Sequence, residues 1–178
     1  MKIMGLETAR SSTPQYFRDK LYEAFKIIIS KTNDELISFV NAVRAETKEQ
    51  GTEGVAFPRG VNNLEKYRSR TDIYSKGTPI HVRGSLLYNH YLKKYGIENK
   101  HQRIQEGEKI KFMYLKTPNP IHENCISFFT EIPDEFGIQK YVDYQTQYEK
   151  SFLEPLKNVL ECVGWTHEKK ITLGSFFE

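Results

Sequence analysis

The sequence predicts an α+β protein that is rich in helix and carries a small antiparallel sheet. Apolar residues recur at helical spacing in several long stretches, whereas one stretch alternates in the manner of a half-buried strand. The 178 residues correspond to about one domain. Their 38% hydrophobic and 28% charged residues are typical of a soluble globular protein. No apolar run approaches the length needed to span a bilayer.

The N-terminal third is expected to form two helices. Thr13 is a plausible N-cap with Pro14 at the first helical position. Thr32 or Asn33 caps the second helix, which ends near residues 50–52. The expected buried faces are Phe17, Leu21, Phe25 and Ile28 in the first helix, and Leu36, Ile37, Val40 and Val43 in the second.

Two further helical patterns follow. The first covers residues 79–96, with Gly96 as its C-terminal cap. The second runs from Asp143 to Gly164, and Pro155 inside it predicts a kink or two abutting helices.

The sheet is expected from three short segments. Residues 109–116 alternate between apolar and basic side chains, and residues 125–129 are predicted to pair with them; residues 55–58 form another short strand. Cys125 and Cys162 lie far apart and have no metal-ligand spacing, which predicts buried, reduced thiols and a cytoplasmic location.

The net charge of +3 is the sum of a basic N-terminal part and an acidic C-terminal part. Residues 1–117 carry 21 Lys and Arg against 13 Asp and Glu, while residues 118–178 carry 5 against 10. The basic N-terminal part favours contact with a polyanion. Ordinary solvated surfaces explain the same distribution equally well.

The residue types that usually carry catalysis lack the required spacing. The chain contains no Asp-x-Asp pair for two-metal phosphoryl transfer and no P-loop or Gly-x-Ser-x-Gly motif. Its five histidines show no ligand spacing. No catalytic residue and no metal ligand is therefore expected in this chain.

The segment 59–70 is the strongest candidate for contact with nucleic acid. Residues 59–83 contain six basic residues against two acidic ones, among amide and hydroxyl side chains that suit phosphate oxygens. Residues 10–12, Arg-Ser-Ser, form a second small cluster of this kind. A solvated loop remains the alternative interpretation.

The last residues need an explanation of their own. Leu173, Phe176 and Phe177 are spaced i, i+3 and i+4 and would form one face of a helical turn. They either dock on the core of the protein itself or anchor the chain in a groove on a partner.

In this order, these regions resemble the C-terminal end of a family B DNA polymerase, specifically the replicative polymerase of T-even-like phages. Lys2-x-x-Gly5-Leu6-Glu7-x-x-Arg10 is similar to the last palm motif. Residues 62–67 and 79–83 resemble the thumb elements that hold newly made duplex. The match continues through residues 106–109 and 148–156, and residues 173–177 are similar to the sliding-clamp-binding tail.

The resemblance implies a terminal palm segment at residues 1–12, a thumb domain at residues 13–166 and a flexible clamp-binding tail at residues 167–178. It implies that Leu173 and the two phenylalanines bind the sliding clamp. The residues expected to contact DNA are Arg10, Ser11, Ser12, Arg59, Asn62, Asn63, Lys66, His81, Arg83 and Lys150.

The resemblance also implies partners. The catalytic carboxylates and their Mg²⁺ would belong to a large polymerase subunit with palm, fingers and exonuclease, so that this chain is inactive alone. The other partners would be primer–template DNA and the sliding clamp, with no membrane. In an intact family member the palm motif follows hundreds of residues, whereas here it follows one Met, which favours a split polymerase over an expressed fragment.

The residues themselves leave two other functions to consider. A free-standing, sequence-nonspecific nucleic-acid-binding accessory protein would need no polymerase partner, but such a self-contained domain should not need the strand-like residues 3–7. An independent enzyme requires an active site that the sequence does not supply.

Overall fold

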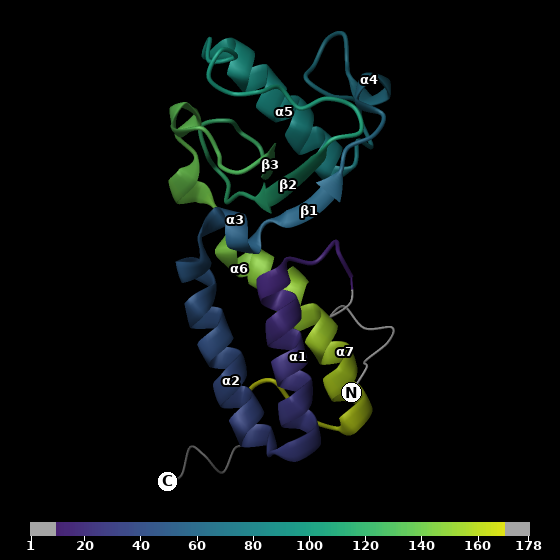
Figure 1. Ribbon diagram of the computed structural model, residues 1–178, viewed down its shortest axis with the longest axis vertical. Helices are drawn as coiled ribbons and strands as arrows, with labels where there is room; N and C mark the ends of the chain where they lie inside the picture. The colour runs from purple at the N-terminus through teal and green to yellow at the C-terminus, as the bar shows by residue number, and fades with distance from the viewer. Residues whose placement is uncertain (1–9, 170–178) are drawn as a thin grey trace. The chain divides into compact units, whose positions relative to one another are not determined.

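The computed structural model describes residues 10–169 and confirms a helix-rich α+β protein with a small antiparallel sheet (Figure 1). The chain divides into two compact units. Of the described residues, 10–50 and 148–169 form the first unit, and Gly51–Gln147 form the second. The boundaries expected for a palm segment, a thumb domain and a tail stay predictions.

The first unit is a bundle of helices. α1 (Gln15–Ser30) and α2 (Asn33–Glu46) run in opposite directions, and α7 (Glu154–Val163) lies beside them (Figure 1). Apolar faces hold the bundle together, because each buried side chain is removed from water. As predicted, the buried residues include Phe17, Leu21 and Phe25 in α1 and Leu36, Ile37, Val40 and Val43 in α2, whereas Ile28 is half-buried.

The start of α2 follows the sequence prediction. The hydroxyl of Thr32 accepts a hydrogen bond from the backbone N–H of Glu35 at 3.4 Å, and the Glu35 carboxylate accepts one from the N–H of Thr32 at 3.0 Å. These reciprocal bonds form a capping box. The hydrogen bond from the Thr32 backbone lowers the pKa of Glu35.

The start of α1 differs from its prediction by one residue. Pro14 occupies the N-cap position with an extended ψ of 141°, and the helix begins at Gln15. Thr13 is only 4% exposed, and its N–H donates to the carbonyl of Arg10 in a turn. Thr13 is therefore part of the packed turn that leads into α1 and does not cap it.

The helical pattern predicted from residue 143 is interrupted before Pro155. It consists of α6 (Tyr144–Tyr148), the π-helical turn η5 (Glu149–Leu153) and α7. Pro155 lies in the first turn of α7, where its missing N–H costs least. The sequence predicts a kink or two abutting helices at Pro155, whereas the structure joins α6 to α7 through a π-helical turn that ends before it. Gly164, with φ of 71°, ends α7 as expected.

A three-stranded antiparallel sheet lies in the second unit. The strands β1 (Phe57–Gly60), β2 (Lys109–Tyr114) and β3 (Cys125–Phe128) are arranged in the order β1-β2-β3. The predicted pairing of β2 with β3 is confirmed, with Phe112 opposite Ser127. The prediction of a strand at residues 55–58 is two residues too early, because Val55 still belongs to the short helix α3 (Gly51–Val55).

One long helix, α5 (Ile80–Lys94), packs against β3 (Figure 1). Gly84 permits this approach: a Cβ at that position would lie 2.5 Å from the Oγ of Ser127. Gly96, with φ of 65°, follows the helix in the left-handed conformation predicted for its cap. The remaining elements are η2 (Thr47–Gln50), α4 (Leu64–Tyr67), η3 (Asp134–Phe136) and η4 (Gln139–Tyr141).

The two cysteines differ in environment. Cys125 is fully buried on β3, as predicted. The prediction is wrong for Cys162, which is exposed because it lies on the outer side of the last turn of α7. Among residues 10–169, none of the helices has both the length and the apolar character to cross a membrane.

Candidate nucleic-acid interface

The residues predicted to contact DNA are divided between the two units. Arg10, Ser11, Ser12 and Lys150 belong to the first unit. The clamp-binding candidates Leu173, Phe176 and Phe177 lie outside the described residues. The second unit contains Arg59, Asn62, Asn63, Lys66, His81 and Arg83.

Arg59 and His81 meet on one aromatic ring. The Arg59 guanidinium carbon lies 5.7 Å from the centroid of the Phe112 ring and equally far from that of Phe57. The centroid of the His81 ring lies 6.4 Å from that of Phe112. Burial and the nearby charge of Arg59 lower the pKa of His81. The structure thus brings together two predicted residues from β1 and α5.

The segment around α4 is held by a carboxylate. Glu106 accepts hydrogen bonds from the backbone N–H groups of Asn63 at 2.5 Å and Leu64 at 2.9 Å. Asn63 has φ of 65°, in the left-handed region that Asn tolerates better than most residues. This arrangement leaves the side chains of three predicted residues exposed: Asn62, Asn63 and Lys66.

Arg83 lies in a different set of contacts. Its Nη2 donates to the Oδ1 of Asn124 at 2.6 Å, and its Nε donates to the Sγ of Cys125 at 3.3 Å. The guanidinium carbon is 5.7 Å from the centroid of the Tyr74 ring. The Tyr74 hydroxyl donates to the Glu123 carboxylate at 2.5 Å. The structure therefore gives Arg83 partners that are distinct from those of Arg59.

In the first unit, Arg10 and Ser11 are exposed and Ser12 is half-buried, directly before α1. Lys150 is exposed on the π-helical turn, 3.9 Å from the Glu154 carboxylate. Both partners of this ion pair are well exposed, so the pair adds little stability.

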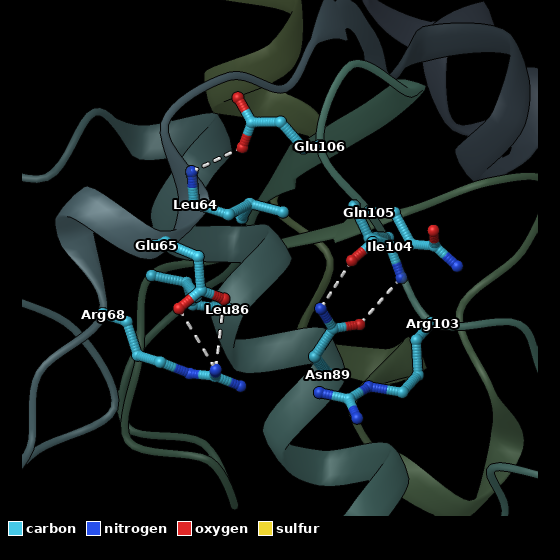
Figure 2. A pocket seen from close by; sticks show the side chains of 9 residues that line it. All are labelled: Leu64, Glu65, Arg68, Leu86, Asn89, Arg103, Ile104, Gln105 and Glu106. Carbon is cyan, nitrogen blue, oxygen red and sulfur yellow. Dashed lines mark hydrogen bonds and ion pairs between the residues drawn. The ribbon is translucent and has the colours of Figure 1, made fainter.

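A pocket of about 390 Å³ lies between α4, α5 and the loop before β2 (Figure 2). The side-chain amide of Asn89 donates to the carbonyl of Ile104 and accepts from its N–H, both at 2.8 Å, which fixes the loop to α5. Arg68 pairs with Glu65 at 3.1 Å. In the view of Figure 2, the side chains of Arg68 and Arg103 extend toward one another from opposite sides.

The sequence did not predict the residues that support Arg83 and the segment around α4. Glu106 lies within a matched segment, but no role was predicted for it. Asn124 contacts Arg83 from a position 41 residues later in the chain, and Tyr74 contacts it from a loop nine residues earlier; no local pattern indicates either partner. Basic composition identified the cations, whereas their supporting acceptors depend on the tertiary fold.

The predicted DNA-contacting residues share side chains that are chemically suited to anions. Arginine and lysine side chains, amides and a half-buried imidazole offer hydrogen-bond donors to phosphate oxygens. Among residues 10–169, His, Cys, Asp and Glu form no group of three or more that could hold a metal ion.

Two relatives are similar to this chain over almost its whole length. The chain is 28% identical over 181 residues to the DNA-directed DNA polymerase of Enterobacteria phage T4, a match that covers 99% of the chain. It is 30% identical over 182 residues to the DNA-directed DNA polymerase of Escherichia phage RB69, a match that covers 100% of the chain. No family model matches.

The chain spans about a fifth of the length of these curated relatives, since each match covers 20% of the polymerase. The similarity nevertheless includes all the segments on which the resemblance was based. The resemblance of this chain to part of the DNA polymerases of T-even-like phages, predicted from its ordered motifs, is therefore confirmed.

Proposed function

We propose that this chain is the thumb-containing part of a family B phage DNA polymerase and that it grips the primer–template duplex during replication. The observation that carries the proposal is the similarity to two phage DNA polymerases, which extends over 99–100% of the chain. The distribution of exposed and half-buried cations supports it. The chemistry would take place in a larger part of the polymerase, in a separate subunit under the split-polymerase hypothesis.

In the second unit, Arg59, Lys66 and the amides of Asn62 and Asn63 would bind phosphate oxygens. The ring of Phe112 restricts the Arg59 side chain before DNA binds. The Glu106 carboxylate restricts the backbone at Asn63 and Leu64 through its two hydrogen bonds. Such preorganisation reduces the conformational entropy lost on binding. Contacts to phosphate and sugar position a duplex without reading its sequence.

In the first unit, Arg10, Ser11 and Ser12 would approach the primer strand, and Lys150 would add a further contact to the backbone. The segment before residue 10 would complete the palm of the polymerase. The palm would supply the carboxylates that hold Mg²⁺.

The C-terminal residues would dock on a sliding clamp. Leu173, Phe176 and Phe177 would enter an apolar groove, as large apolar anchors do in peptide recognition. Clamp and polymerase on one DNA would raise the effective concentration of each for the other, which increases processivity without new contacts to DNA.

The test is the affinity of the 178-residue chain for DNA, measured by fluorescence anisotropy with two duplexes of unrelated sequence. The logarithm of the binding constant should fall linearly with the logarithm of salt concentration, by about 0.9 for each phosphate neutralised. Both duplexes should give the same slope. Absence of binding, or a strong preference for one sequence, would contradict duplex gripping.

A second test concerns the polymerase partner. Co-expression with a large polymerase subunit should yield a complex, and removal of residues 1–7 should disrupt it while leaving the fold of residues 10–169 intact. A chain that binds duplex but never co-purifies with such a subunit would favour the free-standing accessory protein.

A further inference from the structure

Arg83 extends from a rigid part of the second unit. The neighbouring Gly84 allows α5 to approach β3 so closely that a Cβ there would lie 2.7 Å from the backbone nitrogen of Ser127. The Ser127 hydroxyl donates to the carbonyl of His81 at 2.8 Å. The backbone that carries Arg83 is therefore fixed against the sheet.

The guanidinium of Arg83 is fixed along one edge. Its Nε and Nη2 donate to Cys125 and Asn124, respectively, and the Tyr74 ring lies against the planar group. Cys125 is itself fully buried, and burial raises the pKa of its thiol. The sulfur therefore stays a neutral acceptor at neutral pH, and the negative charge near the Arg83 guanidinium is that of the Glu123 carboxylate.

The loop that supplies these acceptors has its own support. The buried side chain of Asn119 donates to the carbonyls of Lys116 and Glu123 at 2.8 and 2.6 Å and accepts from the N–H of Ile121 at 3.1 Å. Glu123 in turn accepts the hydrogen bond from Tyr74. Asn124 thus approaches Arg83 from a loop held by several hydrogen bonds, and the same loop holds the Tyr74 ring in place.

A guanidinium carries five N–H donors in a planar fork, so donors remain for another acceptor beyond those directed at Asn124, Cys125 and the Tyr74 hydroxyl. A phosphate oxygen pair fits such a fork in bidentate geometry. Lysine offers neither the planar shape nor the two fixed donors that this set of contacts uses.

From this geometry we infer that Asn124, Tyr74 and Cys125 are positioning residues that aim the Arg83 guanidinium at a phosphate of the nucleic-acid backbone. The inference rests on the proposed function, because the phosphate belongs to the duplex that the chain grips. It adds to that function a set of residues that would act through Arg83 without touching DNA.

A double-mutant cycle tests the inference on the full chain. Arg83→Ala should weaken duplex binding about tenfold, in the range expected for a hydrogen bond to a charged group. Asn124→Ala should weaken it less and should have no further effect in the Arg83→Ala background. Arg83→Lys should lose most of the affinity despite its retained charge. Asn99→Ala, at an exposed position on another loop, is the matched control and should leave affinity unchanged.

A second measurement separates positioning from a loss of fold. Tyr74→Phe keeps the ring but removes the hydrogen bond to Glu123, so it should keep the fold in a urea titration and still weaken binding. The ¹H–¹⁵N signal of the Arg83 Nε should exchange slowly with water in the wild type and faster in Asn124→Ala.

The outcomes distinguish this inference from the proposed function. Equal weakening by Asn124→Ala with and without Arg83 would overturn the inference. So would an unchanged affinity in Arg83→Ala while Arg59→Ala with Lys66→Ala weakens binding, a result that leaves duplex gripping intact. A wild-type chain that binds no duplex would instead overturn the proposed function, and the inference with it.

Discussion

Arg59 and His81 lie against the same aromatic ring, that of Phe112, with the guanidinium carbon at 5.7 Å and the imidazole centroid at 6.4 Å from the ring centroid. One residue comes from the edge strand β1 and the other from the first turn of α5. Their proximity has a measurable electrostatic consequence, because a cation disfavours a second positive charge beside it.

The pKa of His81 should lie below 6.5 in the free protein, because burial and, to a smaller extent, the Arg59 charge disfavour the imidazolium. Arg59→Ala should raise this pKa partway toward 6.5, and bound duplex should raise it because phosphate favours the charged form. NMR titration of the ring protons measures both changes. A pKa that is the same in Arg59→Ala and wild type would show that the two side chains do not interact.

The same shift has a consequence for stability. As the pH falls below 6.5, the unfolded state takes up a proton that folded His81 resists, so the free energy of unfolding decreases until the pH passes the folded pKa. His90 and His167 have lowered pKa values as well and contribute in the same direction. His81→Gln should therefore reduce the acid-induced loss in a urea titration. An identical pH profile in wild type and variant would contradict this assignment.

Gly84→Ala should destabilise the second unit by about 1–3 kcal/mol, the usual cost of overpacking. The added Cβ would lie 2.5 Å from the Oγ of Ser127 and 2.7 Å from its backbone nitrogen, and the backbone cannot move aside cheaply. Gly60→Ala is the matched control, because a Cβ there meets nothing within 4 Å. Urea unfolding compares the two variants. A Gly84→Ala protein as stable as Gly60→Ala would show that α5 and β3 are not so closely packed.

Much of the fold was predictable because burial imposes a period on the sequence. The apolar spacing of residues 17–25 and 36–43 identified the buried faces of α1 and α2, and Thr32 with Glu35 marked a helix start. The alternation in residues 109–116 identified β2. These signals are local, so they can be interpreted without the tertiary structure.

The predictions were wrong at positions where tertiary packing determines the helix start or the burial of a side chain. Pro14 could equally be the first helical residue or its cap, and the packing of Thr13 favoured the second arrangement. Cysteine is usually a buried residue type, but Cys162 lies on the outer side of α7.

The candidate site was predictable in its cations and not in their partners. Basic residues among amides identified Arg59, Lys66 and Arg83 from composition. The contacts of Arg59 with Phe112 and of Arg83 with Asn124 join segments far apart in the chain, and such pairs follow only from the topology of the sheet and α5.

The tail makes an independent prediction, although residues 170–178 lie outside the described structure. Replacing Phe176 and Phe177 by Ala should weaken binding to a phage-type sliding clamp by about 2 kcal/mol or more, because buried aromatic anchors dominate such interfaces. Ser175→Ala is the control. Clamp binding by calorimetry and primer extension by the assembled polymerase measure the effect. Clamp-stimulated synthesis should be lost while extension of short primers continues, and equal loss of both would contradict a role in clamp docking.

The most direct test of duplex gripping compares two charge-matched double variants. Arg59→Ala with Lys66→Ala removes cations that are proposed to bind phosphate, whereas Lys100→Ala with Lys140→Ala removes equal charge from exposed positions that are not proposed to touch DNA. Urea titrations first establish that both variants are folded.

The measurement is the salt dependence of duplex affinity for both variants and for the wild type. In the Arg59 and Lys66 variant the slope should become shallower by about 0.9 for each phosphate that is no longer neutralised, and it should stay close to that of the wild type in the Lys100 and Lys140 variant. Equal slopes in all three proteins would contradict the claim that Arg59 and Lys66 hold the duplex.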